Sequence, residues 1–292
     1  MSTLLLHTSE QEKLTLVDAK TLEIIQKFDV PGRTAVLGAS PHQRFGFAIH
    51  RDHDAITIID GVAGIHLGTI TVENQPTHFH AYDGHILIFN DGSGSVSLFW
   101  EEDLCAGKVA PQQLKVGPPD HGSAVLVENI LLAGFLRSGR VIAYQLDNME
   151  KLLEFNGCTA LHGAAQIDNI AIFGCKDGVL LIQKESDTLV SVQIANPSNT
   201  SSQNRVGIIA THPKSKIAVG NWGTGLALIF PQEKTMKIIN LPAHPLKFSF
   251  DDAGDFVLVL GHDGYLYELD LEGNIIRRSQ LLDAVIPPKG RD

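Results

Sequence analysis

The sequence predicts an all-β protein, and three observations support this prediction. The 292 residues are 43% hydrophobic and include 27 glycines and 13 prolines, a composition typical of globular proteins. Short apolar strings rich in β-type residues recur about every forty residues along the chain. The intervals between them carry no amphipathic helix with recognisable caps, which disfavours a fold that alternates strands with helices.

The recurring strings are expected to be equivalent strands, the third in each repeat. They begin at residues 13, 55, 95, 140, 179, 225 and 265 and read KLTLVDA, AITIIDG, SVSLFWE, RVIAYQL, VLLIQKE, GLALIFP and YLYELDL. Three of them follow Asp91-Gly92, Asp177-Gly178 or Asp263-Gly264, and Ser138-Gly139 precedes a fourth. Because Asp-Gly tolerates the positive φ of a tight turn, these strings are expected to form hairpins with the strands before them.

Each repeat supplies four strands. Two apolar strands stand upstream in the repeat, as in THFHAYD followed by HILIFND, and a more polar strand such as QQLKVG completes it. Seven repeats of four antiparallel strands predict a seven-bladed β-propeller, with residues 1–292 as a single domain. We expect LLDAVIPP, residues 281–288, to join TLLLHT, KLTLVDA and LEIIQKFDV in one blade, so that strands from both ends of the chain close the ring. The alternative is a β-sandwich or two stacked β domains; WD40 signatures are absent.

The charge distribution argues against nucleic-acid binding. The formal net charge is −10, and Lys and Arg are scattered, with no run longer than Arg277-Arg278. The first residues, MSTLLLHTSEQEKLTL, carry no basic segment, and their apolar run is too short for a secretory signal or a membrane span. We therefore expect no membrane insertion and a cytoplasmic location, or a periplasmic one if a signal has been trimmed.

Four of the thirteen histidines recur at the same point of the repeat, the start of an inner strand. These strand-start histidines are His78, His121, His162 and His244. Inner strands of a propeller run in one direction around a central channel, so the four imidazoles are expected to meet at one mouth of that channel. Imidazole nitrogen is a good ligand for zinc, and three or four such donors make a tetrahedral site. We read the other histidines of the repeats as surface or satisfied residues.

Cysteines and a carboxylate flank two of these histidines. If Asp168-Asn169 makes a two-residue turn, Cys175 stands opposite His162, and Cys158 lies just upstream. The two cysteines then either form a disulfide that holds the loop of His162, contribute a thiolate to the metal, or are unrelated free cysteines. Asp120 is an alternative ligand, but adjacent strand residues point to opposite faces, so it is expected to orient an imidazole or to face the loop.

At these residues the chain resembles the seven-bladed propeller zinc metallochaperones of the AztD type. The matching strings are PTHF with IFNDGSGSV, DHGSAV, and CTALHG followed by FGCKDGV; they span residues 70 to 180, and the likeness is looser towards the end of the chain. The resemblance implies a histidine-rich zinc site at the propeller mouth, a disulfide beside it, and transfer of the metal by direct contact to the solute-binding protein of a zinc ABC importer. That family is exported and has a His-rich or acidic segment near its N-terminus, and neither a signal nor such a segment is found here.

Three functions follow from these observations. The first is a zinc-binding metallochaperone or zinc-storage protein, without enzymatic activity. The second is a metal-dependent hydrolase or lactonase, but no pair of carboxylates and no serine nucleophile stands near the strand starts to act as base or nucleophile. The third is a metal-free propeller that serves as an interaction scaffold. Cu(II), Ni(II) and Co(II) also accept imidazole, so the sequence indicates zinc only as the preferred metal.

Overall fold

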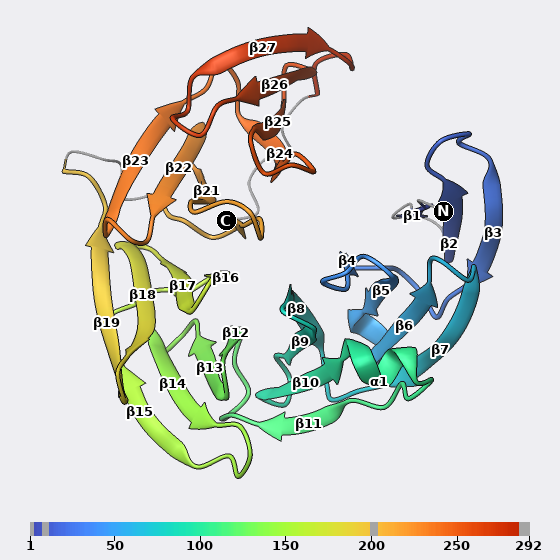
Figure 1. The fold of residues 1–292 in the computed structure, drawn as a ribbon, viewed down its shortest axis with the longest axis horizontal. Helices are drawn as coiled ribbons and strands as arrows, with labels where there is room; N and C mark the ends of the chain where they lie inside the picture. The colour runs from blue at the N-terminus through green and yellow to red at the C-terminus, as the bar shows by residue number, and fades with distance from the viewer. Residues whose placement is uncertain (1–2, 8–11, 199–203, 286–292) are drawn as a thin grey trace. The chain divides into compact units, whose positions relative to one another are not determined.

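The computed structural model describes residues 3–7, 12–198 and 204–285. The chain folds into seven antiparallel sheets that follow one another in chain order, as the colours of Figure 1 show. The chain divides into two compact units: residues 1–126 with 142–152, and residues 127–141 with 153–292. No helix in the described ranges is long and apolar enough to cross a membrane.

The first unit contains the first three sheets. The first sheet consists of β1 (Thr3–His7), β2 (Lys13–Asp18) and β3 (Ile24–Asp29). The second has β4 (Val36–Ala39), β5 (Phe45–His50), β6 (Ala55–Asp60) and β7 (Ile65–Thr71), with the 3-10 helix η1 (Arg51–His53) after β5. The third has β8 (Pro76–Tyr82), β9 (His85–Asn90), β10 (Ser95–Trp100) and β11 (Gln112–Lys115), with helix α1 (Glu101–Cys105) after β10.

The last three sheets belong to the second unit. They are β16 (Ala164–Ile167), β17 (Ile170–Cys175), β18 (Gly178–Glu185) and β19 (Thr188–Ala195); β20 (Ile209–Ala210), β21 (Ala218–Trp222), β22 (Gly225–Phe230) and β23 (Thr235–Asn240); and β24 (Pro245–Phe250), β25 (Val257–Gly261), β26 (Tyr265–Leu269) and β27 (Ile275–Gln280). The fourth sheet of the chain has the order β12 (Gly122–Val127), β13 (Ile130–Phe135), β14 (Arg140–Gln145) and β15 (Lys151–Phe155).

This architecture confirms the seven-bladed propeller and its four-stranded repeat. All seven recurring strings are strands, and in the six four-stranded sheets each is the third strand of its sheet. The first sheet has three strands within the described residues. Of the eight residues expected to close it, 281–285 form no strand and 286–288 lie outside the described residues.

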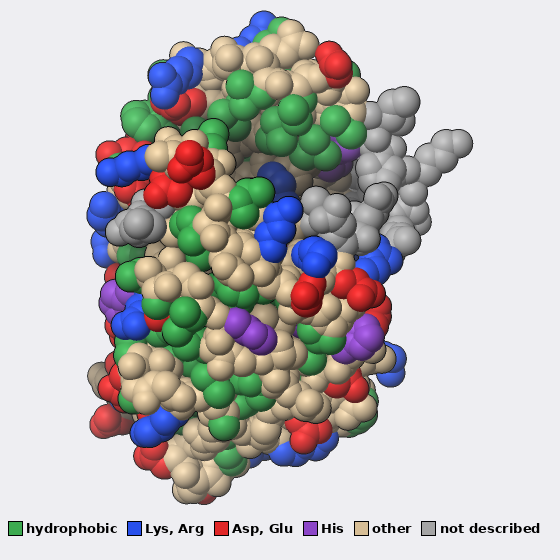
Figure 2. All heavy atoms as spheres, turned by 90° about the vertical axis from the view of Figure 1, so that its right-hand side faces the viewer, with side chains coloured by type: hydrophobic (Ala, Val, Ile, Leu, Met, Phe, Trp, Pro, Cys, Tyr) green, Lys and Arg blue, Asp and Glu red, His purple; other side chains and the backbone are tan. Residues whose placement is uncertain are grey.

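Burial explains why the strings are apolar without alternation. The cores lie between successive sheets, as in the cluster that joins Phe47, Ile58, Ile86 and Phe99 of the second and third sheets. Central strands such as β6 and β9 are therefore buried on both faces, whereas every residue of the outermost strand β27 is exposed. On the face drawn in Figure 2, acidic and basic side chains are interspersed with apolar ones.

The turns agree with the predicted chemistry in part. Gly139 and Gly264 adopt the positive φ expected of them, +62° and +81°. In the third sheet the positive φ falls on Gly94 rather than on Gly92. The turn that begins at Asn90 is longer than expected, and the N–H of Gly94 donates the hydrogen bond to the Asn90 carbonyl. Helix α1, which ends at Cys105, was not expected.

Candidate metal centre

His78 and His121 lie together in the first unit. His78 is in β8, at a register shift between Pro76 and His78, and His121 immediately precedes β12. Their Nε2 atoms are 2.9 Å apart, and their ring centroids are separated by 4.6 Å with the rings nearly edge to face. Both side chains are half-buried. Two strand-start histidines forty-three positions apart are thus brought into contact through their ring nitrogens.

A carboxylate fixes the orientation of His121. Nδ1–H of His121 donates to Oδ2 of Asp91 over 2.7 Å, and the same oxygen accepts Thr77 Oγ1 and Arg51 Nη1, each at 2.9 Å. Burial alone would raise the pKa of Asp91, but the hydrogen bonds from His121 and Thr77 and the charge of Arg51 hold that pKa below its ordinary value. Because the ionised carboxylate only accepts, it places the Nδ1 proton on His121 and a lone pair on Nε2.

The contact between the two imidazoles follows from that assignment. With a lone pair on Nε2 of His121, the hydrogen bond of 2.9 Å is donated by Nε2–H of His78. A single proton is therefore shared between two nitrogens of the kind that bind zinc, copper or nickel. A metal ion between these nitrogens would be bound by both rings if the proton of His78 moved from Nε2 to Nδ1.

His162, in the second unit, is held by a backbone carbonyl. Its Nδ1–H donates to the Gly207 carbonyl over 2.7 Å, which again leaves the lone pair on Nε2. Asn221 fixes that peptide segment, because its Oδ1 accepts the N–H groups of Gly207 at 2.8 Å and Ile208 at 2.7 Å. Gly163, next to His162, has a positive φ of +77°, and a Cβ there would lie 2.4 Å from the Gly207 oxygen. Only glycine at this position of the Leu-His-Gly string leaves room for the Gly207 carbonyl.

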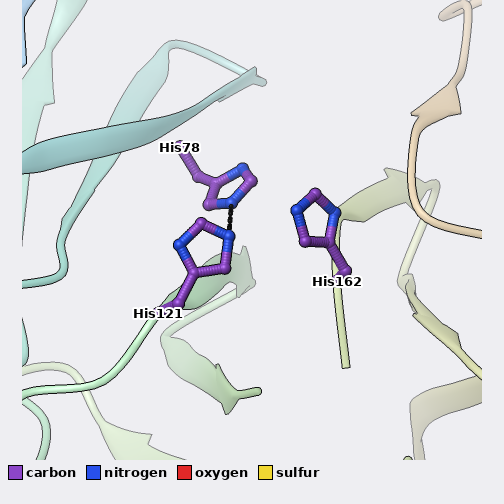
Figure 3. Close-up of side chains that lie close together, drawn as sticks. All are labelled: His78, His121 and His162. Atoms are coloured by element: carbon purple, nitrogen blue, oxygen red, sulfur yellow. Dashed lines mark hydrogen bonds between the residues drawn. The ribbon is translucent and has the colours of Figure 1, made fainter. Parts of the chain in front are cut away.

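The structure groups three of the four strand-start histidines. One ligand nitrogen from each of His78, His121 and His162 lies within 4.8 Å of the other two, as Figure 3 illustrates. Their side chains are all half-buried. Three imidazoles at this spacing are a donor set that suits zinc, which takes nitrogen ligands in tetrahedral geometry.

Cys158 and Cys175 form a disulfide, with their Cα atoms 4.9 Å apart. The two alternatives, a thiolate ligand and unrelated free cysteines, are therefore wrong. The predicted turn at Asp168-Asn169 is confirmed by the pairing of Ile167 with Ile170. The regular ladder ends at Ala164, two residues from His162, whose N–H donates to the Gly174 carbonyl over 2.9 Å. The disulfide and this hydrogen bond both attach the His162 loop to β17.

His244 lies elsewhere in the described structure. It immediately precedes β24, as predicted, but it is exposed, and the group of three histidines within the described residues does not contain it. Its ring faces that of His262, with centroids 5.5 Å apart, and the His262 N–H donates to the His244 carbonyl. His262 was interpreted as a surface or satisfied residue, so this second pair was not anticipated.

Asp120 is buried and donates its N–H to the Asp91 carbonyl over 3.1 Å. The carboxylate bound to the His121 ring belongs to Asp91, which the sequence identified only as a turn residue. Its position opposite the His121 loop depends on the third sheet, and the single sequence signal was its place in the string IFNDGSGSV.

Comparison with known proteins agrees with the fold and with the sequence resemblance. The chain is 25% identical over 248 residues to the zinc chaperone AztD of Citrobacter koseri, which covers 82% of this chain and 58% of that protein. The chain thus spans little more than half the length of this curated relative. No family model matches.

Solved structures show the same fold over nearly the whole chain. The structure of apo AztD from Citrobacter koseri superposes with a TM-score of 0.88 at 21% identity, covering 98% of this chain and 83% of that one. A second AztD structure from Citrobacter koseri gives 0.84 at 20% identity, with 96% and 81% covered. The computationally designed Ika8 protein gives 0.72 at 14% identity, with 97% and 86% covered. The resemblance of this chain to the propeller zinc metallochaperones of the AztD type is therefore confirmed, in sequence and in fold.

Proposed function

We propose that this protein is a zinc metallochaperone or zinc-storage protein that binds zinc through Nε2 of His78, His121 and His162. The observation that carries the proposal is the pair of Nε2 atoms 2.9 Å apart, one of them on a ring whose Nδ1 is fixed by Asp91. Carboxylate or carbonyl partners on the far nitrogen of a histidine are typical of metal-binding imidazoles, because they fix the tautomer and increase ligand basicity. His162 has the same arrangement through Gly207.

Zinc fits the pair of His78 and His121 with a small movement. Zn–N bonds of about 2.0–2.1 Å at a tetrahedral angle place two nitrogens about 3.3 Å apart. The nitrogens of His78 and His121 therefore need to separate by only a few tenths of an ångström. For Nε2 of His78 to bind zinc as a neutral imidazole, its proton would move to Nδ1 of the same ring, so the pair would bind zinc without a net release of protons.

The similarity to a zinc chaperone supports a role in handling the metal rather than in catalysis. We infer that the recipient is the solute-binding protein of a zinc ABC importer, and that the protein acts without enzymatic activity, nucleic acid or insertion into a membrane. The disulfide between Cys158 and Cys175 supports an oxidising compartment such as the periplasm, because disulfides are rare in the reducing cytosol.

A metal-dependent hydrolase is the second candidate. The observation that favours it is the number of grouped histidines, since three protein ligands leave one tetrahedral position for water, as in catalytic zinc sites. Turnover of lactone or ester substrates by the zinc-loaded protein, lost in the His121→Ala variant, would favour this function over that of a chaperone.

Zinc titration of single-histidine variants tests the proposal. We expect the wild-type chain, stripped of metal and dialysed against zinc, to retain about one equivalent, as a three-histidine site requires. His78→Ala, His121→Ala and His162→Ala should each weaken zinc binding by at least about a hundredfold, because two imidazoles seldom retain zinc. His244→Ala is the matched control: unchanged affinity supports the three-histidine set, and a comparable loss makes His244 the fourth ligand. A wild-type chain that takes up no zinc contradicts the proposed function.

A further inference from the structure

One carboxylate oxygen of Asp91 accepts three hydrogen bonds. His121 Nδ1, Thr77 Oγ1 and Arg51 Nη1 all donate to Oδ2, and Oδ1 has no hydrogen-bond partner in the described part of the chain. The side chain of Asp91 is only 6% exposed, whereas that of Arg51 is 33% exposed. Arg51 and His121 therefore share a single buried charge, and water competes little for that charge.

Arg51 is held in this position from a second side. Its Nη2 donates to Gln75 Oε1 over 3.2 Å, and it belongs to η1, which follows β5 of the second sheet. Asp91 belongs to the turn after β9 in the third sheet. The guanidinium thus bridges two neighbouring sheets of the first unit and reaches the carboxylate beside His121.

A shared carboxylate supports a metal-bound imidazole less than an unshared one. A carboxylate on Nδ1 raises the basicity of the ring and stabilises the positive charge that the metal brings. A guanidinium on the same oxygen neutralises much of that negative charge and stays protonated at every physiological pH. Its own positive charge also repels a divalent cation on the other side of the ring.

We propose that Arg51 lowers the zinc affinity of the site by sharing Oδ2 of Asp91 with His121, so that the bound zinc can be passed to a recipient. This inference rests on the proposed function. It makes Arg51 an affinity-setting residue that touches no metal ligand itself and acts through Asp91.

The direction of the effect separates this role from a merely structural one. If Arg51 only held the Asp91 turn in place, its removal would loosen His121 and weaken zinc binding. If Arg51 neutralises part of the charge of Asp91, its removal restores the full negative charge beside His121 and strengthens zinc binding. The two roles therefore predict opposite changes in the dissociation constant.

The test is competition between the full chain and a chromophoric zinc chelator at fixed pH and salt. Arg51→Gln and Arg51→Met, which both remove the charge, are expected to lower the dissociation constant for zinc about tenfold, within the range of outer-shell effects. Asp91→Asn is expected to raise it tenfold or more. Adding Arg51→Gln to Asp91→Asn should change little further, because the shared carboxylate is already gone.

Arg44→Gln is the matched control. Arg44 also binds a buried carboxylate, that of Asp60, with Nη2 at 2.8 Å from Oδ2, so its removal takes away the same charge from the same unit. The dissociation constant of the Arg44→Gln variant for zinc should stay within about twofold of wild type, since Arg44 contacts none of the proposed ligands.

Unchanged or weaker zinc binding in both Arg51 variants overturns the inference, and so does an equal tightening in the Asp91→Asn background. Far-UV circular dichroism confirms that each variant is folded. A wild-type chain that shows no zinc affinity in the same assay contradicts the proposed function instead. Failure of the Arg51 inference and failure of the proposed function therefore give different results.

Discussion

At the residue scale, the candidate site depends on what each imidazole does with its second nitrogen. His121 donates Nδ1–H to a carboxylate and His162 donates to a peptide carbonyl, so the two rings carry different electrostatic support. A charged partner strengthens an imidazole ligand more than a neutral one. We therefore expect His121 to be the ligand whose surroundings set the affinity, which is where Arg51 acts.

A different histidine contributes to the acid sensitivity of the fold. His85 is 4% exposed beside Trp100, and burial lowers its pKa from 6.5 to about 4. Between these two values the unfolded chain binds a proton that the folded chain does not, so the free energy of unfolding falls as the pH is lowered from about 6.5 towards 4.

The His85→Leu variant tests this contribution. The wild type should lose about 2 kcal/mol more stability than the variant when the pH is lowered from 7 to 5, because the variant has no proton to take up at this position. Urea unfolding at the two pH values measures the difference. Parallel pH dependences for the two proteins would show that His85 titrates normally in the folded state.

At the element scale, the recurring strands could be recognised in the sequence because burial on both faces makes them uniformly apolar. Every residue of β6 and of β9 is buried, and such runs stand out from the exposed strands around them. Helix α1 has five residues, too few for a helical period to show in the sequence. The strand β20 has only two, because the segment before it is shaped by the hydrogen bonds of Asn221 rather than by a ladder.

The disulfide is the element-scale feature with the largest expected effect on stability. Cys158 and Cys175 are separated by 17 positions, and closing a loop of this length stabilises the folded state by about 3 kcal/mol. We expect the Cys158→Ala/Cys175→Ala variant to lose about that much free energy of unfolding in urea. It should also bind zinc more weakly, because the bond fastens the loop that ends at His162.

Cys105→Ala is the control for that variant. Cys105 is exposed and is not part of a disulfide, so its replacement should leave both the urea midpoint and the zinc affinity unchanged. Equal zinc affinity in the disulfide variant and the wild type would show that the hydrogen bond from His162 to Gly174 suffices to hold the loop.

At the scale of the whole molecule, we propose that residues 1–292 form a single domain although they divide into two compact units. The chain passes between the units three times, after residues 126, 141 and 152, so neither unit is a continuous segment of sequence. A continuous segment can fold by itself more readily than one interrupted in this way.

Calorimetry of the metal-free chain tests this proposal. We expect one transition whose calorimetric and van't Hoff enthalpies agree, and two separate transitions would contradict it. Zinc at a hundred times its dissociation constant should stabilise the chain by about 2.7 kcal/mol and raise that single transition, provided that it binds only the folded state.

The sequence by itself determined the repeat, the seven equivalent strands and the positions of the strand-start histidines. These features are local: strand length, apolar runs and turn residues depend on neighbours a few positions away. The same is true of the turn at Asp168-Asn169.

Only the tertiary structure decided which of these residues meet. It paired Cys158 with Cys175, and it grouped three histidines while placing His244 beside His262. It also gave His121 its carboxylate from Asp91 and gave Asp91 its guanidinium from Arg51, across 30 and 40 positions of sequence. Such contacts depend on how successive sheets pack and on the exact course of their connecting turns, and a single sequence carries no local signal for either.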